Sequence, residues 1–192
     1  MRTAVKVAFE ATLILAIGFV GCTSSKSIAR KEGIAELQRM RSAVQDMNIV
    51  VSAGVTNVEY SRRLTDALLK FGGQDGGCKQ AVQKFQDPEQ QSFAAEACQP
   101  LSTAMIAYTN AKEYVSPKTD PIDPEFVIYT LPDDEYRKVR ETIPTLAELP
   151  VSETNQDGYK FYRRRDMVQA LWKVAGQEYQ LAEAAIEKLG PT

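Results

Sequence analysis

The sequence predicts an all-α protein: a helical bundle of three or four long helices with a Pro-rich irregular connection and one disulfide. Apolar residues recur at a spacing of three and four over residues 31–70 and again over 159–189, which indicates long helices. Four prolines within residues 116–132 exclude a long helix there. Inside that stretch only 126–131 is β-prone, and no other segment offers it a clear partner. We therefore expect 126–131 to pack as an extended segment over the bundle.

The composition restricts the possible chemistry. The chain has 192 residues, 23 Lys plus Arg, 25 Asp plus Glu, three Cys and no His. Without histidine it cannot form a Ser–His–Asp or Cys–His catalytic group, a histidine-bound metal or haem site, or a histidine pH sensor. The net charge of −2 argues against nucleic acid as a partner. We expect no cofactor.

The N-terminal residues have the pattern of a secretory signal peptide. Arg2 and Lys6 supply a positive start, residues 11–20 are mostly apolar, and Gly21 and Cys22 follow. The apolar run is shorter than the roughly 20 residues that a membrane-spanning helix needs. The pattern therefore predicts export. The alternative is an uncleaved signal anchor in which Cys22 is incidental.

Phe19-Val20-Gly21-Cys22 resembles the lipobox of bacterial lipoproteins, in which a small residue precedes a cysteine that is lipidated after cleavage. Phe19 stands where leucine is usual. The resemblance implies a signal peptide at 1–21, a lipidated Cys22 with a polar tether at 22–30, and a single helical domain at 31–192. Because Thr23 rather than Asp follows the cysteine, the same resemblance favours the outer membrane, with the domain in the periplasm.

Cysteine parity agrees with this interpretation. Three thiols would leave one unpaired in an oxidising compartment, but lipidation would use Cys22. Cys78 and Cys98 are then the only possible disulfide, and periplasmic redox conditions favour its formation. The alternative is two buried free thiols.

The first long helix is predicted after the polar residues 23–27. Its apolar face would carry Ile34, Leu37, Arg41, Val44, Asn48, Val51, Val55, Val58, Arg62, Thr65 and Leu69. Seven of these eleven positions are apolar, which is enough for a face packed against a core. Gly54 leaves two versions open, one continuous helix or a helix that breaks there.

The middle of the chain is predicted to hold a loop and two helices. Residues 72–77 are Gly-rich and lack the Lys-Ser/Thr ending of a phosphate-binding loop, so they predict a hinge. A short helix over 78–86 would follow. Asp87, with Pro88 behind it, predicts the start of a longer helix that ends near 115. Pro100 should kink or split that helix.

The last part of the chain is predicted to hold a short helix and a long one. Asp133-Asp134-Glu135 opens the short helix, since acidic residues favour a helix N-terminus. The long helix is expected from about Tyr159 to Leu189. Its core positions would be Val168, Leu171, Ala175, Ala182, Ile186 and Leu189, with Trp172 and Tyr179 beside them.

The best candidate site is the segment from Tyr159 to Arg165. Consecutive arginines near a helix N-terminus oppose the helix dipole, and a local rule broken without visible gain often marks a functional site. Guanidinium groups beside aromatic rings suit anionic partners. The candidate partner-binding residues are Tyr159, Phe161, Tyr162, Arg163, Arg164 and Arg165. The alternative is a solvated basic turn whose aromatic residues belong to the core.

These features favour a lipid-anchored, non-enzymatic periplasmic module that binds or positions another cell-envelope component, most simply an envelope protein. The alternative is a cell-wall ligand-binding protein or a hydrolase that uses paired carboxylates. Carboxylates cluster over 120–125 and 133–135, where calcium is conceivable but fits no known loop spacing, so no metal site is assigned.

Overall fold

The computed structural model describes residues 2–72, 76–115 and 130–190, and the side chains within them from residue 25 onward. The six helices are α1 (Arg2–Ala53), α2 (Asn57–Phe71), α3 (Gly76–Gln83), α4 (Pro88–Val115), α5 (Asp133–Thr142) and α6 (Arg164–Lys188) among the described residues. Three short strands, β1 (Thr130–Pro132), β2 (Glu153–Thr154) and β3 (Lys160–Arg163), form one small sheet. The predicted helical bundle is confirmed in these broad terms.

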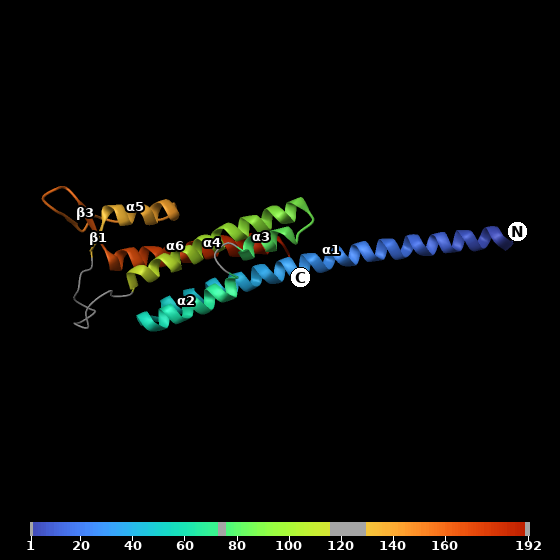
Figure 1. Ribbon diagram of the computed structural model, residues 1–192, viewed down its shortest axis with the longest axis horizontal. Coiled ribbons are helices and arrows are strands. Elements are labelled where there is room, and N and C mark those ends of the chain that lie inside the picture. Colours follow the sequence, from blue (N-terminus) through green and yellow to red (C-terminus); the bar gives the residue numbers. More distant parts are fainter. Residues whose placement is uncertain (1, 73–75, 116–129, 191–192) are drawn as a thin grey trace.

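The helices pack lengthwise into an elongated bundle (Figure 1). Helices α4 and α6 lie side by side, the C-terminal half of α1 and helix α2 pack along them, and α3 lies between α1 and α4. The N-terminal half of α1 projects from one end of the bundle, and the sheet and α5 lie at the other end. The segment 22–30, expected to be a polar tether, lies within α1. No helix among the residues whose side chains are described carries an apolar stretch long enough to cross a membrane.

The predicted apolar face of the first helix is confirmed as far as Val51. Ile34, Leu37 and Val44 are buried, and Val51 is partly buried against the core. Arg41, a polar position within that face, is half-buried and donates from Nε to Glu183 Oε1 of α6 at 3.1 Å. The polar positions therefore link helices rather than interrupt the packing.

Val55 is still partly buried against the core, but the predicted face is wrong beyond it, because the helix breaks at Gly54. Gly54 has a φ of +77°, a left-handed conformation that favours glycine. The chain then reverses, and Thr56 caps α2 by accepting a hydrogen bond from the Glu59 backbone N–H at 3.3 Å. Because of this break, the spacing of core-facing residues in α1 does not continue into α2. Val58 and Leu69, predicted for the core, are 81% and 75% exposed. The buried residues of α2 are instead Tyr60, Leu64, Ala67 and Phe71.

A buried polar network connects the four longest helices. The Trp172 indole Nε1 of α6 donates to the Tyr60 hydroxyl of α2 at 3.2 Å, and that hydroxyl donates to the Tyr108 backbone carbonyl of α4 at 2.8 Å. The Tyr108 hydroxyl donates to Asn48 Oδ1 of α1 at 2.5 Å. Burial raises the pKa of both tyrosines well above its usual value, so both stay protonated donors. The network explains the tolerance of polar Asn48 at a core-facing position.

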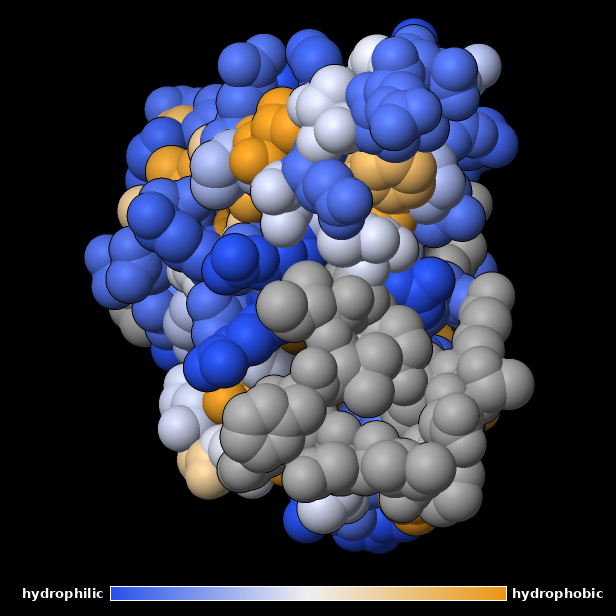
Figure 2. Space-filling view, turned by 90° about the vertical axis from the view of Figure 1, so that its left-hand side faces the viewer, coloured by the Kyte–Doolittle hydropathy of each residue, from blue (hydrophilic) through white to orange (hydrophobic). Residues whose placement is uncertain are grey.

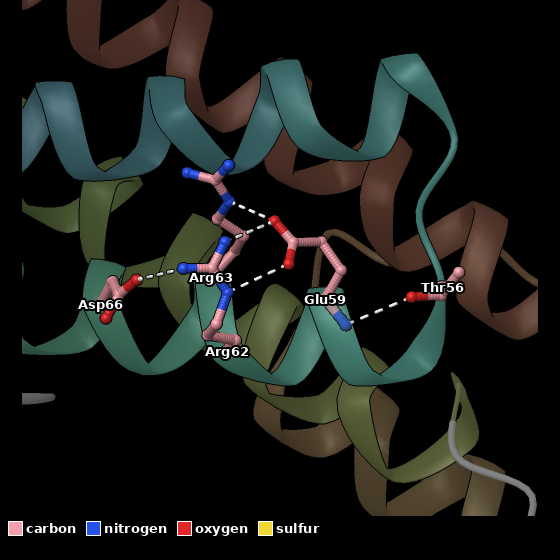
Figure 3. A network of polar contacts seen from close by, with 5 residues as sticks. All are labelled: Thr56, Glu59, Arg62, Arg63 and Asp66. Atoms are coloured by element: carbon pink, nitrogen blue, oxygen red, sulfur yellow. Dashed lines mark hydrogen bonds and ion pairs between the residues drawn. The ribbon is translucent and has the colours of Figure 1, made fainter.

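The outer face of α2 carries an ion-pair cluster (Figure 3). The Glu59 carboxylate accepts from Arg62 Nη2 at 2.8 Å and from Arg63 Nε at 2.6 Å. Arg62 also lies 4.0 Å from Asp66. Hydrogen bonds from Arg62 and then Arg63 lower the pKa of Glu59 to about 2. All four side chains are largely solvated, so the cluster orders the helix surface and contributes little to folding.

We expect Glu59 to titrate well below an unfolded glutamate, whose pKa is about 4.3. Because the folded pKa is the lower one, its small stabilisation is present above the unfolded pKa and disappears as the pH falls toward about 2. Carboxyl-carbon NMR of the folded chain would measure the pKa directly. In a variant with Arg62→Gln and Arg63→Gln it should return toward its ordinary value. An ordinary pKa for Glu59 in the parent chain would contradict its pairing with Arg62 and Arg63.

The sheet corrects two expectations. Strand β3 lies between β1 and β2 and is antiparallel to both, with Leu131 opposite Tyr162 and Glu153 opposite Phe161. The β-prone segment thus has a partner in its last residues, although 126–129 lie outside the described residues. The final helix begins at Arg164 rather than near Tyr159 because residues 160–163 pair as a strand. The long-range pairing overrides the local helical spacing.

The remaining helices follow the predicted pattern except at Pro100. Asp87 Oδ1 caps α4 by accepting from the Glu89 backbone N–H at 3.0 Å. Helix α4 continues through Pro100, which is buried, so the predicted split is wrong. Helix α4 packs along α6 over this part of the bundle. All six predicted core positions of the last helix are buried: Val168, Leu171, Ala175, Ala182, Ile186 and Leu189.

Candidate functional site

The six candidate partner-binding residues lie together at the end of the bundle opposite the N-terminal half of α1 (Figure 1). They occupy the end of the β2–β3 hairpin, strand β3 and the first turn of α6. Figure 2 faces this end, and its coloured part shows a mostly hydrophilic surface with a few hydrophobic residues among hydrophilic ones. The six differ in burial: three are exposed, two are half-buried and one belongs to the core.

Tyr162 belongs to the core and holds the sheet on α5. It is 5% exposed, its ring stacks on Tyr136 with centroids 4.3 Å apart, and its hydroxyl donates to Asp133 Oδ1 at 2.8 Å. Burial, followed by the bond to Asp133, raises the pKa of Tyr162 to about 12. The Tyr136 hydroxyl in turn donates to the Ala147 carbonyl at 3.1 Å. Tyr162 therefore supports the surface and is not available to a partner.

The hairpin brings Tyr159 to the outside. The Asn155 Oδ1 accepts from the backbone N–H groups of Asp157 and Tyr159 at 3.1 and 2.8 Å, and Gly158 takes a φ of +81°. This turn leaves the Tyr159 side chain 64% exposed. Val151, on the other arm of the hairpin, is 43% exposed and was not predicted as part of the site. The Asp157-Gly158 pair, a common hairpin turn, is the sequence pattern that could have located both.

Two of the three arginines present exposed guanidinium groups. Arg163 is exposed and donates from Nε to Ser152 Oγ at 3.3 Å, which fixes it across the hairpin. Arg165 is exposed. Neither arginine forms an ion pair with another described residue. Arg164 is half-buried, close enough to Tyr114 to act on its pKa. We call Tyr159, Phe161, Arg163 and Arg165 the hairpin surface; Phe161 is partly buried.

The start of α6 is electrostatically unfavourable. Its N-cap residue is Arg163, which makes no capping side-chain bond, and Asp166 is the one acidic residue in the first turn. Positive charge at a helix N-terminus costs roughly 0.3–1 kcal/mol per exposed residue. Asp or Ser at the cap would be the stabilising choice. The sequence thus keeps arginines at a position that the helix disfavours.

The cysteine pair corrects another expectation. Cys78 and Cys98 do meet, with sulfurs 2.6 Å apart, but they are free thiols and not the predicted disulfide. The Cys78 thiol also lies 3.3 Å from the Cys98 carbonyl oxygen and 3.4 Å from Ser102 Oγ. A hydrogen bond from the Cys98 thiol lowers the pKa of Cys78, whereas that bond and burial raise the pKa of Cys98. The bundle supplies the proximity that a disulfide needs without containing the bond.

The acidic residues that could have held calcium have structural partners. Asp133 accepts from Tyr162 and lies 3.5 Å from Arg137, in the first turn of α5. Within the described part of the chain no group of three acidic or cysteine side chains could hold a metal ion, and residues 120–125 lie outside that part. A shallow groove between α1 and α3, about 390 Å³ in volume, is crossed by the ion pair of Lys84 with Glu32 at 2.7 Å.

Cys22, the predicted lipidation site, lies in α1 among residues whose side chains are not described. Comparison of the chain with protein-family models, with curated proteins and with solved structures finds no match. The hairpin surface and the cysteine pair are therefore the features from which function can be argued.

Proposed function

We propose that this protein is a lipid-anchored, non-enzymatic periplasmic module that binds another cell-envelope component through the hairpin surface. The observation that carries the proposal is the position of that surface at the far end of the bundle from α1's projecting half (Figure 1). Lipidation at Cys22 would place the N-terminal end next to the membrane, and the lipobox resemblance favours the outer membrane. The hairpin surface, at the opposite end of the bundle, would then bind the partner.

The two ends of α6 lie at opposite ends of the bundle. Arg30 of α1 donates to the Leu189 carbonyl at the C-terminal end of α6 at 2.5 Å. The hairpin surface lies at the N-terminal end of α6, 25 residues away. At 1.5 Å per residue that separation is about 37 Å. The exposed arginines would therefore face away from the anchoring membrane, which argues against its own headgroups as their partner.

The chemistry of the surface supports an acidic protein partner. Exposed guanidinium groups bind carboxylates in a planar, bidentate geometry, and exposed Tyr159 and Val151 add apolar contact beside them. Aromatic residues and arginine are the types that dominate binding energy at protein interfaces. Core residue Tyr162 fixes strand β3 beneath these groups through its stacking on Tyr136 and its bond to Asp133. Binding should therefore cost little conformational entropy in the strand.

The test is crosslinking of intact bacterial cells that express the C-terminally tagged chain, followed by purification and identification of the bound protein. We expect an envelope protein in near-stoichiometric amount, and at least a tenfold loss when Arg163→Ala and Arg165→Ala are combined. The matched control combines Arg62→Ala and Arg63→Ala, which removes two arginines already paired with Glu59 on α2. Circular dichroism should show both variants folded.

Three outcomes separate the possibilities. Loss of the partner from the Arg163/Arg165 variant alone supports the hairpin surface. Equal loss from both variants would mean that general positive charge, not this surface, recruits the partner. Recovery that neither variant changes would overturn the proposed surface, and glycan in place of protein would favour the cell-wall ligand-binding alternative.

The anchor has its own test. A Cys22→Ala variant should take up no labelled fatty acid and should leave the membrane fraction, because the lipid supplies most of the membrane affinity. Membrane retention of that variant would instead indicate an uncleaved signal anchor.

We also propose that export to an oxidising compartment lets Cys78 and Cys98 close into the disulfide that the sequence predicts.

A further inference from the structure

The cysteine pair lies where three helices meet. Cys78 is on α3, Cys98 is on α4, and Met40 of α1 packs against the Cys78 sulfur at 3.9 Å. The two cysteine sulfurs are 2.6 Å apart. Since the sulfurs already touch, a bond between them requires no rearrangement of the helices.

The two thiols differ in access and surroundings. Cys98 is 5% exposed, whereas Cys78 is only half-buried, so an external reagent reaches Cys78 first. The hydroxyl of Ser102 lies 3.4 Å from the Cys78 sulfur and can donate to it when that sulfur is a thiolate. Donation from the Cys98 thiol lowers the pKa of Cys78, which increases its thiolate fraction. Both its accessibility and its surroundings therefore favour Cys78 as the nucleophile.

We propose that Cys78 and Cys98 form a directional thiol–disulfide exchange site, with Cys78 as the attacking thiol and Cys98 as the resolving one. The Cys78 thiolate attacks a donor disulfide, forming a mixed disulfide and releasing one donor sulfur as thiolate. Cys98 then gives up its proton and attacks the Cys78 sulfur, which releases the second donor sulfur. The Cys78–Cys98 pair is oxidised, and the donor disulfide is reduced to two thiols.

The substrate class is a disulfide small or mobile enough to reach Cys78 beside α3: an exposed disulfide of an oxidising protein, or a low-molecular-weight disulfide. This inference rests on the proposed function only for the compartment that would supply the donor. The exchange itself is a property of the purified chain. The exchange reaction can therefore be absent even if the hairpin surface binds a partner. It can equally be present if the hairpin surface binds none.

The experiment uses oxidised glutathione as the probe on the purified, reduced full chain. Trypsin separates the cysteines, because Cys78 falls in the peptide 71–79 and Cys98 in the peptide 85–112. We expect these two peptides of the parent chain to become joined with the loss of two hydrogens, and neither of them to keep a lasting glutathione adduct. A Cys98→Ser variant should trap one glutathione on Cys78. A Cys78→Ser variant should acquire glutathione on Cys98 at least tenfold more slowly.

Either of two results would overturn the proposal: no adduct on Cys78 when Cys98 is serine, or equally fast adducts in both variants. A second measurement does not depend on the folding of the variants. Brief alkylation of the reduced parent chain with limiting iodoacetamide should label the peptide 71–79 before the peptide 85–112. The opposite order would assign the attacking role to Cys98.

Discussion

Replacement of Tyr60 by Phe is expected to lower the free energy of unfolding by about 2 kcal/mol. The change removes a single hydroxyl from a fully buried side chain and leaves the ring packing in place. It leaves the Trp172 indole N–H without its acceptor and the Tyr108 carbonyl without one of its donors. Orphaned buried donors cost about 1–3 kcal/mol because they were desolvated on folding.

Chemical denaturation followed by tryptophan emission would measure this effect. Trp172 is the single tryptophan of the chain and lies inside the network, so its emission should also shift in the folded state. The matched control is Tyr159→Phe, which removes an exposed hydroxyl at the hairpin and should change stability by less than about 0.5 kcal/mol. Equal effects of the two substitutions would contradict a structural role for the network.

Closing the Cys78–Cys98 bond is expected to raise the free energy of unfolding by about 3 kcal/mol, because it joins residues about 20 positions apart and restricts the unfolded chain. The bond would also tether α3, a helix of eight residues that is too short to be stable alone. The gain should be close to this value, since the sulfurs are already adjacent and little strain is added.

Denaturant unfolding of the oxidised and reduced parent chain would give this difference. In a Cys78→Ser variant the same two redox conditions should give one unfolding curve, because no second thiol remains near Cys98. A gain that persists in this variant would have to come from another cysteine. A parent chain that is no more stable when oxidised would show that the bond distorts α3 or α4.

Local patterns predicted much of the helical architecture. The stripe through Ile34, Leu37 and Val44 is buried as expected because a continuous helix repeats its faces every 3.6 residues. The Asp87 cap and the core face of α6 follow equally local rules. The prediction from this spacing was wrong after the break at Gly54. A single residue with left-handed backbone conformation ends α1 there, and α2 buries a different set of positions.

The sequence singled out the segment from Tyr159 to Arg165, whose binding role stays a prediction, but it did not show which of these residues are buried. The consecutive arginines singled it out because their conflict with the helix dipole is visible without coordinates. The sequence could not separate buried Tyr162 from exposed Tyr159. That separation depends on the hairpin, which places Tyr159 in its turn and Tyr162 on the buried side of β3, and β3 exists only because residues 130–132 and 153–154 pair with it.

The sequence by itself determined the buried faces of α1 and α6 and the starts of α4 and α5, because these depend on residues within about four positions of one another. It also contains the N-terminal pattern from which export and lipidation are proposed. The tertiary structure alone decided the three-stranded sheet, the polar network from Asn48 to Trp172 and the contact of Cys78 with Cys98. Each of these joins residues distant in the chain, and only the packing of the whole bundle brings them together.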